Sequence, residues 1–400
     1  MAFVNGKTNH HHESRSRIAF SMDILIFDMD GVLIDVSKSY RKTIQQTIQI
    51  YLEGCLGFER SRRGWIADEE ISHFKSVGGF NNDWELTSGL LLYLLSTSGI
   101  SPLPKRKKFS SIPEVVSYLK TKSSIFHRKP IRLKRKHLLS FLEKVKSKGG
   151  GLRGVRRALG TSWEGWVYGV GDRDQGNLVK RIFQEVYLGK IFSRRYHLRP
   201  IFYKGKGLYL QERTMIPGKI LATLRKRVRM GIASGRPRFE AELALSRFRL
   251  HPYFDSVVTL NECEAEENHM FLSAGKKIAF SKPHPYSILR VVQEIGIPNP
   301  YCAYVGDVVD DMVAARAARK CLQILAIGFL TGHRNKKINR ESLMKAGADL
   351  VIENPEQLLR FVSSLRPADL RNAQAGLFPP RGIVSKRKVG RQGVKLIKEG

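Results

Sequence analysis

The sequence has few cysteines and no long apolar run. Only four cysteines occur in 400 residues, at Cys55, Cys263, Cys302 and Cys321, and their spacing fits neither a zinc site nor a disulfide framework. They predict reduced thiols in a cytoplasmic protein. Apolar stretches such as "GLLLYLL" and "LQILAIGFL" are too short to span a bilayer. The first residues also lack the basic, apolar and small-residue pattern of a secretory signal.

Negative charge is scarce: 36 acidic residues face 69 lysines and arginines, and the formal net charge is +33. Residues 101–160 carry about +16 and residues 366–400 about +7, whereas 22–37 and 216–365 together carry only about +3. Such basic blocks are either solvated faces or sites for non-specific polyanion binding. Residues 101–160 contain few aromatics for base stacking, and no nucleic-acid motif is visible.

The stretch "DILIFDMDGVLID", residues 23–35, places acids directly after a short apolar run. Residues 24–27 have the composition of a central parallel strand that is covered on both faces. Because ligands bind beyond the carboxyl ends of such strands, Asp28 and Asp30 are expected at the mouth of a site. The alternative is an ordinary turn with two solvated carboxylates, since Asp is common in turns.

From residue 217 onward, helical patterns alternate with short apolar strands, which predicts an α/β fold with a doubly wound parallel sheet. The first strand must join this sheet across a long gap, so we expect an inserted, mainly helical domain. The expected boundaries are a disordered extension at 1–21, a core of 22–37 plus 216–365, an insert at 38–215 and a flexible basic tail at 366–400. Within the insert, residues 207–213 alternate like a short strand.

The basic block 101–160 lies inside this insert. Its flanking residues, Pro102, Pro104 and Gly149–Gly151, are typical of an added module, so we expect its deletion to leave catalysis largely unchanged. Residues 137–148 are nevertheless amphipathic at helical spacing, which indicates that part of the block is ordered.

Further polar groups follow other strands of the predicted sheet. Ser234 ends one strand, Lys282 lies in "SKPHP" before a helix, and Asp307 ends a later strand with Asp310 and Asp311 close behind. Because carboxyl ends of parallel strands share one edge, these groups should converge. Hard oxygen ligands favour Mg²⁺, and a lysine beside a helix N-terminus favours a phosphate.

In these motifs the sequence resembles the haloacid dehalogenase (HAD) superfamily. "DMDGVL", "ASGRP", "KPHP" and "GDVVDD" look like its four motifs, in the right order, over residues 22–37 and 216–353. The layout is similar to the branch with a helical cap that includes phosphoglycolate phosphatase and β-phosphoglucomutase. Residues 38–215 would be this cap, here enlarged, and we call them the cap segment. The fold implied is a Rossmann-like core with an inserted helical cap.

The resemblance implies a Mg²⁺-dependent phosphatase that acts on a small phosphomonoester, such as phosphoglycolate or a sugar phosphate. Asp28 would be the nucleophile that forms an aspartyl phosphate, and Asp30 the general acid and base. The metal would be held by Asp28, the backbone carbonyl of Asp30 and Asp307, with Asp311 binding a metal water or orienting the ligands. Dehalogenases lack a second acid at Asp30, so a phosphate-ester reaction is favoured over dehalogenation. A phosphomutase of the same superfamily, or a nucleic-acid-associated protein that holds polyanions with its basic segments, remains the alternative.

Substrate contacts are expected from the core and from a loop between two helices of the cap segment. The expected residues are Ser234, Gly235, Arg236, Lys282, Lys75, Asn81 and Asn82. The loop residues among them are equally compatible with a simple helix connection. Trp163 and Trp166 favour core packing over stacking on a ligand.

Overall fold

The computed structural model describes residues 22–365 except 81, 105–106, 125–134, 172, 174–175 and 333–334. The expectations for residues 1–21, the tail 366–400 and Asn81 therefore lie outside the described residues. None of the described helices combines the length and the apolar composition that a membrane crossing requires.

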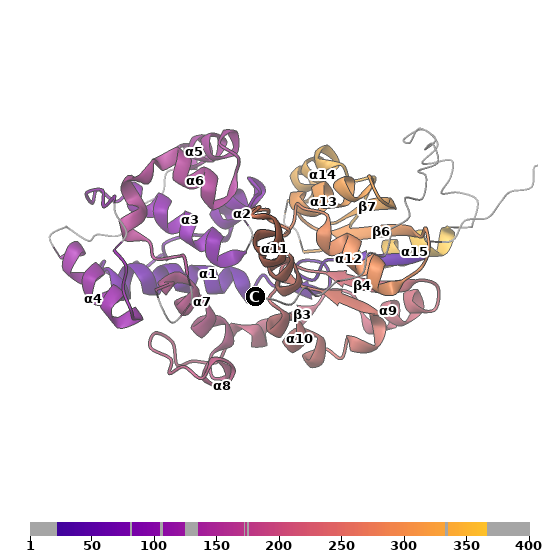
Figure 1. The fold of residues 1–400 in the computed structure, drawn as a ribbon, viewed down its shortest axis with the longest axis horizontal. Helices are drawn as coiled ribbons and strands as arrows, with labels where there is room; N and C mark the ends of the chain where they lie inside the picture. Colours follow the sequence, from indigo (N-terminus) through magenta and orange to yellow (C-terminus); the bar gives the residue numbers. More distant parts are fainter. Residues whose placement is uncertain are drawn as a thin grey trace, which may run out of the picture. The chain divides into compact units, whose positions relative to one another are not determined.

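A six-stranded sheet has the strand order β5-β4-β1-β6-β7-β8, and every neighbouring pair is parallel (Figure 1). The predicted α/β class is therefore confirmed, and the first strand does join strands that follow it by some two hundred residues, between β4 and β6. The strands are β1 (Ile24–Phe27), β4 (Arg229–Ala233), β5 (Ser256–Val258), β6 (Tyr301–Gly306), β7 (Gln323–Phe329) and β8 (Leu350–Ile352).

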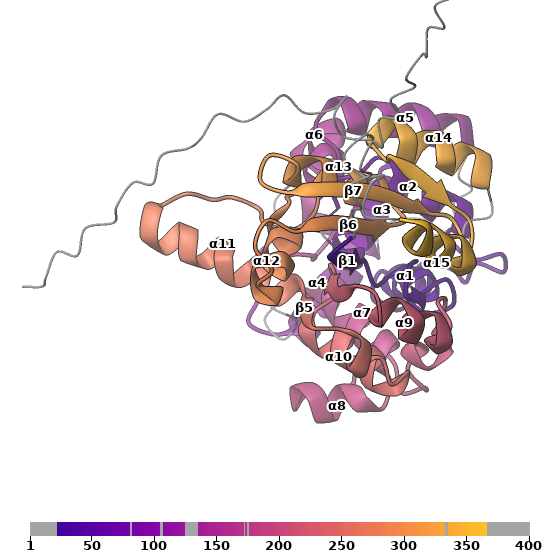
Figure 2. The ribbon, with the colours of Figure 1, turned by 90° about the vertical axis from the view of Figure 1, so that its right-hand side faces the viewer.

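Helices pack on this sheet (Figure 2). The helices of this part of the chain are α9 (Gly218–Arg225), α10 (Arg238–Arg247), α11 (Leu260–Ala274), α12 (Tyr286–Ile295), α13 (Val309–Ala318), α14 (Lys336–Ala346) and α15 (Pro355–Ser364). Helix α11 contacts α12 and projects away from the sheet in Figure 2. Helix α12 contacts β4 and β5, α13 contacts β6 and β7, and α14 contacts β7 and β8. Ile24 and Ile26, two residues apart on β1, are buried in one cluster with Val291 of α12 and Met312 of α13. Leu25 and Phe27, on the opposite face, are also fully buried, so β1 is covered on both faces, which explains its unbroken apolar run.

The cap segment is mainly helical, as predicted. Its helices are α1 (Tyr40–Gln49), which continues as a π-helix (Ile50–Cys55), α2 (Asp68–Ser76), α3 (Asp83–Ser96), α4 (Ile112–Ser123), α5 (Arg135–Ser147), α6 (Gly151–Leu159), a 3-10 turn (Thr161–Trp166), α7 (Leu178–Leu188) and α8 (Ile191–Tyr196). Two short strands, β2 (Ile34–Asp35) and β3 (Arg213–Thr214), pair antiparallel. The outgoing and returning connections of the cap segment are therefore held side by side.

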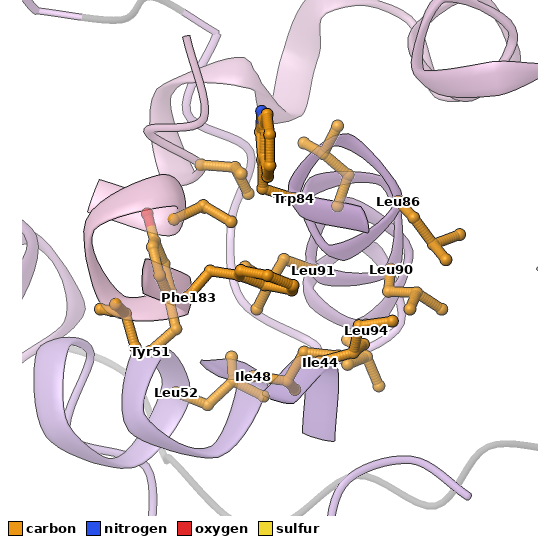
Figure 3. Close-up of a cluster of buried hydrophobic side chains, with 14 of the residues drawn as sticks. Ile44, Ile48, Tyr51, Leu52, Trp84, Leu86, Leu90, Leu91, Leu94 and Phe183 are labelled. Carbon is orange, nitrogen blue, oxygen red and sulfur yellow. The ribbon is translucent and has the colours of Figure 1, made fainter. Parts of the chain in front are cut away.

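The cap segment has its own hydrophobic core around α3 (Figure 3). Helix α3 is buried on all sides from Leu86 to Leu95, and Leu90, Leu91 and Leu94 are fully buried between α1, α6 and α7. Ile44 of α1 and Phe183 of α7 meet them there. Trp166 is also buried in this cluster, as the packing interpretation predicted, and Trp163 packs against it half-buried.

The basic block is part of this core, so the expectation of an accessory module is wrong. Leu138 and Val145 of α5 and Val155 of α6 are fully buried in the same cluster as α3. The backbone N–H of Gly151 donates to Gly78 O at 2.8 Å, so the glycines pack against the loop after α2 instead of acting as a linker. The amphipathic helix predicted at 137–148 is confirmed. Lys144 and Lys146 of α5 and Arg153 and Arg157 of α6 are exposed, so these cations lie on the outer face of a structural element.

Two local expectations differ from the structure. Residues Leu208–Gln211 form a 3-10 turn, and only Arg213–Thr214 is a strand, because the returning connection packs tightly against α7: a Cβ on Gly207 would lie 2.5 Å from the carbonyl carbon of Leu188. Helix α11 was not predicted at all. The helix starts at a capping box, in which the backbone N–H of Thr259 donates to the Glu262 carboxylate and the Thr259 side chain accepts from the backbone at the start of the helix. This sequence signal was overlooked because the strands and helices on either side already alternate as expected.

Candidate active site

The loop after β1 carries Asp28 to the carboxyl edge of the sheet. The Asp28 backbone N–H still donates to Val305 O at 2.8 Å, so the pairing of β1 with β6 extends to this residue. The chain then turns at Gly31, which has a φ of 79°. A Cβ on Gly31 would lie 2.1 Å from Asp307 Oδ2. Glycine is therefore needed here both for the turn and for the close approach of the Asp307 carboxylate.

Lys282 lies between two carboxylates. Its Nζ is 2.8 Å from Asp28 Oδ1 and 2.7 Å from Asp311 Oδ1, and it donates to Tyr304 Oη at 3.0 Å. Burial alone would lower the pKa of Lys282, but Asp28 and Asp311 outweigh it, so the pKa is raised well above its usual value. The ammonium group is therefore a fixed positive charge beside Asp28.

Asp311 is fully buried, and both of its carboxylate oxygens already have partners. Oδ1 accepts from Lys282 Nζ and from Tyr304 Oη at 2.9 Å. Oδ2 accepts from the backbone N–H groups of Asp307 at 3.1 Å and Val308 at 3.2 Å, at the start of α13. Asp311 thus contacts both the lysine and the loop that carries Asp307.

A metal ion fits the same edge of the sheet. Carboxylate oxygens of Asp28, Asp307 and Asp311 lie within 4.8 Å of one another, and Asp307 is the half-buried member. Burial raises the pKa of Asp28 well above its usual value, Lys282 opposes that rise, and the neighbouring carboxylates, Asp311 first, add to it. A divalent cation would offset this crowding of negative charge, and these hard oxygen donors suit one.

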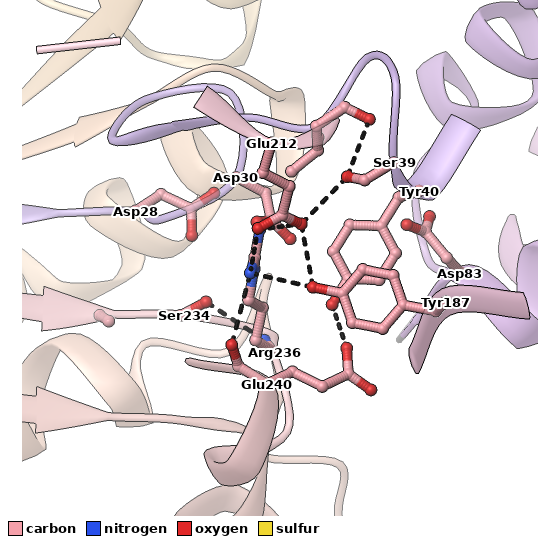
Figure 4. Close-up of polar contacts among 12 residues, drawn as sticks. Asp28, Asp30, Ser39, Tyr40, Asp83, Tyr187, Glu212, Ser234, Arg236 and Glu240 are labelled. Atoms are coloured by element: carbon pink, nitrogen blue, oxygen red, sulfur yellow. Dashed lines mark hydrogen bonds and ion pairs between the residues drawn. The ribbon is translucent and has the colours of Figure 1, made fainter. Parts of the chain in front are cut away.

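Ser234 and Gly235 follow β4, next to β1. The buried Ser234 hydroxyl accepts a hydrogen bond from the backbone N–H of Arg236 at 3.1 Å, and the Ser234 N–H donates to Val258 O. Figure 4 shows Ser234 and Asp28 at the ends of their adjacent strands. A Cβ on Gly235 would meet nothing within 4 Å, so the backbone is open there.

Asp30 and Arg236 form a buried ion pair beside this edge. Arg236 Nε lies 2.5 Å from Asp30 Oδ1, and the arginine side chain has no exposed surface, whereas that of Asp30 is 31% exposed. Burial raises the pKa of Asp30 to about 6, although Arg236 opposes the rise. Arg236 was expected among the substrate contacts, but its guanidinium faces protein carboxylates: Glu212 Oε1 lies 3.1 Å from its Nη2.

The loop residues of the cap segment are placed differently from one another. Lys75 Nζ pairs with Asp83 Oδ1 at 2.9 Å, and the Asn82 side chain caps α3 by accepting from the Glu85 N–H at 2.9 Å. The loop itself reaches the core at Gly79, whose N–H donates to Asp310 Oδ2 at 3.2 Å. Asp310 therefore contacts the cap segment, not the carboxylate cluster.

Some residues of the site carry weak signals in the sequence. Tyr304, a hydroxyl inside an apolar strand three residues before Asp307, was not singled out, although "YVGD" contains it. Glu212, the acid at the end of "GLYLQE", carries no signal in the sequence. It stands out in the structure because its charged side chain is buried, and a sequence does not reveal burial.

Comparisons with known proteins match parts of this chain to one family model and to several proteins. The model described as haloacid dehalogenase-like hydrolase matches residues 138–319. Imidazoleglycerol-phosphate dehydratase of Phytophthora nicotianae is 23% identical over 316 residues, 78% of this chain and 44% of that protein. Phosphoglycolate phosphatase of Xylella fastidiosa is 37% identical over 89 residues, 22% of this chain and 36% of that protein. The chain thus matches less than half of the length of either relative. Among solved structures, phosphatase Tt82 from Thermococcus thioreducens has a TM-score of 0.45 at 22% identity, covering 80% of this chain and 99% of that one.

Proposed function

We propose that this chain, which a haloacid dehalogenase-like hydrolase family model matches over residues 138–319, is a phosphatase that hydrolyses a small phosphomonoester through a phosphorylated Asp28, with Mg²⁺ as its cofactor. The observation that carries the proposal is the 2.8 Å contact between Asp28 and Lys282 at the carboxyl edge of the sheet. An anionic carboxylate beside a fixed ammonium group is a nucleophile next to a binding group for phosphate charge.

In the first step, an Asp28 oxygen attacks phosphorus, and the bond from phosphorus to the ester oxygen breaks. The electron pair goes to the leaving oxygen, which takes a proton from Asp30. The pKa of Asp30, raised by burial to about 6, suits a group that must hold a proton and then give it up near neutral pH.

In the second step, water attacks the phosphorus of the aspartyl phosphate. Asp30, now a carboxylate, takes the proton from the water, the bond from phosphorus to the Asp28 oxygen breaks, and inorganic phosphate is released. Both residues return to their starting protonation states, so the cycle balances.

The remaining residues of the site are proposed to stabilise the negative charge of the phosphoryl group. Asp28, the backbone carbonyl of Asp30 and Asp307 would hold the metal ion, which when bound supplies positive charge for the phosphoryl oxygens. Lys282 adds a second cation, and Asp311 keeps it in place through the 2.7 Å contact. The Ser234 hydroxyl and the backbone at Gly235 are proposed to donate to a phosphoryl oxygen at the start of the segment that leads into α10.

Phosphate release from a panel of esters tests this function. The purified full chain should release inorganic phosphate from at least one of phosphoglycolate, hexitol phosphates and sugar phosphates when Mg²⁺ is present, and Asp28→Asn should release none. A wild-type protein that is inactive on the whole panel with Mg²⁺ would contradict the proposal. Conversion of a sugar phosphate into its isomer without phosphate release would instead identify the mutase alternative.

The exposed cations of α5 and α6 favour a second candidate, non-specific polyanion binding. Lys144, Lys146, Lys148, Arg153 and Arg157 are all exposed, and these two helices pack against each other. Their charges would bind a polyanion in a strongly salt-dependent way. Retention on heparin across a salt series, with charge reversal at Lys144 and Lys146, separates binding by this face from binding by the tail.

A further inference from the structure

Arg236 is a buried hub and not a surface cation. Besides the contact with Asp30, its guanidinium contacts both oxygens of Glu212, at 3.1 and 3.3 Å, and the Tyr187 hydroxyl at 3.3 Å. The Tyr40 ring lies beneath it, 5.1 Å from the guanidinium carbon to the ring centre. Two carboxylates therefore share one fully buried cation, and of the two Glu212 is buried whereas Asp30 is partly exposed.

The partners of this hub come from the two connections of the cap segment. Glu212 directly precedes β3 on the returning connection, and its Oε1 accepts from Ser39 Oγ at 3.0 Å, directly before α1 on the outgoing connection. Tyr187 of α7 donates to the same Glu212 oxygen at 2.9 Å. Figure 4 shows this chain of contacts running from Ser39 through Glu212 and Arg236 to Asp30.

We propose that Arg236 and Glu212 are positioning residues for Asp30, and that they make the orientation of its carboxyl group depend on the two connections of the cap segment. This inference rests on the proposed phosphatase function. Oδ1 of Asp30 is held by Arg236, so a displacement of the guanidinium moves the carboxyl group with it. The position of the guanidinium is set in turn by Glu212, which lies on the returning connection and bonds the outgoing one.

Replacement of Glu212 by Gln tests this role without a change in side-chain size. The neutral amide no longer forms the ion pair that fixes the guanidinium, so Arg236 and the Asp30 carboxyl group bonded to it lose their fixed position beside the leaving group. The effect should depend on the leaving group. Nitrophenolate leaves without a proton, whereas an alkoxide needs one, so only alkyl phosphates require a well-placed Asp30 in the first step.

The measurement is kcat/KM for p-nitrophenyl phosphate and for the best alkyl phosphate of the panel, because kcat/KM reports on the steps up to phosphorylation of Asp28. We expect E212Q to lower the ratio of alkyl to aryl kcat/KM by about tenfold or more, since general acid catalysis contributes about 10²–10⁴. Equal losses on both substrates would mean a structural role only and would overturn the inference.

Tyr187→Phe gives a second, milder variant in case E212Q does not fold. It removes one hydroxyl that contacts both Glu212 and Arg236, and it should lower the same ratio by a smaller factor; an unchanged ratio would count against the proposal. Tyr51→Phe is the matched control, because this tyrosine is equally buried but its hydroxyl donates to Trp166 O, inside the cap segment. The ratio should not change in Y51F.

Failure of this inference can be told apart from failure of the proposed function. If wild-type protein hydrolyses neither substrate, the function is wrong. If it hydrolyses both, Asp28→Asn hydrolyses neither, and Y187F and E212Q keep the wild-type ratio, only the positioning role is rejected.

Discussion

Glu240 offers a sharp test of the buried polar cluster. It lies on α10, and carboxylate oxygens of its side chain accept from the Tyr40 hydroxyl of α1 and from Gln184 Nε2 of α7, the latter at 2.6 Å. Arg236 and Asp30 are the charged groups that face it. Burial raises the pKa of Glu240 from 4.5 to about 7, although Tyr40, Gln184 and Arg236 oppose the rise.

The sign and size of the effect follow from this pKa. Glu240 binds its proton more tightly in the folded chain than in the unfolded chain, so its contribution to stability is fully present below pH 4.5 and is lost as pH rises through about 7. A change from 4.5 to about 7 corresponds to about 3 kcal/mol. Gln at this position resembles the protonated acid and does not titrate. The free energy of unfolding of Glu240→Gln minus that of wild type should therefore increase by about 3 kcal/mol between about pH 4.5 and about pH 8, because wild type alone loses stability over this range.

Urea denaturation of both proteins at several pH values and constant ionic strength measures this difference. The comparison removes contributions from other titrating groups, because they are present in both chains. Glu356→Gln, which changes an exposed carboxylate on α15, is the control and should show no comparable pH dependence. A difference between E240Q and wild type that stays constant with pH would refute the argument, since Glu240 would then be ionised in the folded protein throughout this range.

Four further predictions concern the site and the cap segment. Asp28→Asn should abolish phosphate release while leaving the circular dichroism spectrum unchanged; turnover within about tenfold of wild type would refute its role as nucleophile. Asp307→Ala should raise the Mg²⁺ concentration needed for activity after EDTA treatment, and an activity insensitive to EDTA would exclude the metal. Lys282→Ala should lower kcat by about 10²–10³, and a change in KM alone would place it outside the reacting centre. Val145→Asp should prevent folding of the cap segment because it buries an unpaired charge, whereas the exposed neighbour change Lys144→Asp should give soluble protein with wild-type far-ultraviolet dichroism.

The strands of the sheet were predictable because each is an apolar run that ends at a polar residue. Helix α11 was missed because β5 and α12 already form one strand and the helix after it. An additional helix between them was therefore not needed to complete the alternation of strands and helices. The structural role of the basic block was also concealed. Charge density at 101–160 dominates its composition, yet Leu138 and Val145 of α5 and Val155 of α6 place one face of each helix in the core. Periodicity indicated a helix at 137–148, but it did not indicate what the helix packs against.

The convergence of Asp28, Ser234, Lys282 and Asp307 could be predicted because parallel strands present their carboxyl ends at one edge. The order of the strands and the residue after each strand are enough for this prediction. They do not reveal which side chains point away from the edge of the sheet. Arg236, which follows Ser234 and Gly235 in the sequence, was therefore grouped with the expected substrate contacts. Its neighbours in space, Glu212 and Tyr187, belong to the cap segment, and local patterns do not reveal pairings between such distant segments.

The buried cluster around Arg236 is a costly way to stabilise a fold. Well-packed apolar side chains of similar volume are often as stabilising as a buried ion pair, so the cluster is weak support for stability. Removing one partner of such a pair, however, costs about 3–5 kcal/mol, because a buried charge is left unpaired. Glu212 comes from the returning connection, Ser39 from the outgoing connection and Arg236 from the loop after β4. A displacement of either connection that separates them would therefore be opposed by a penalty of this order. The same contacts that restrict the connections hold Asp30 at 2.5 Å from Arg236, so the restriction reaches the proposed proton donor.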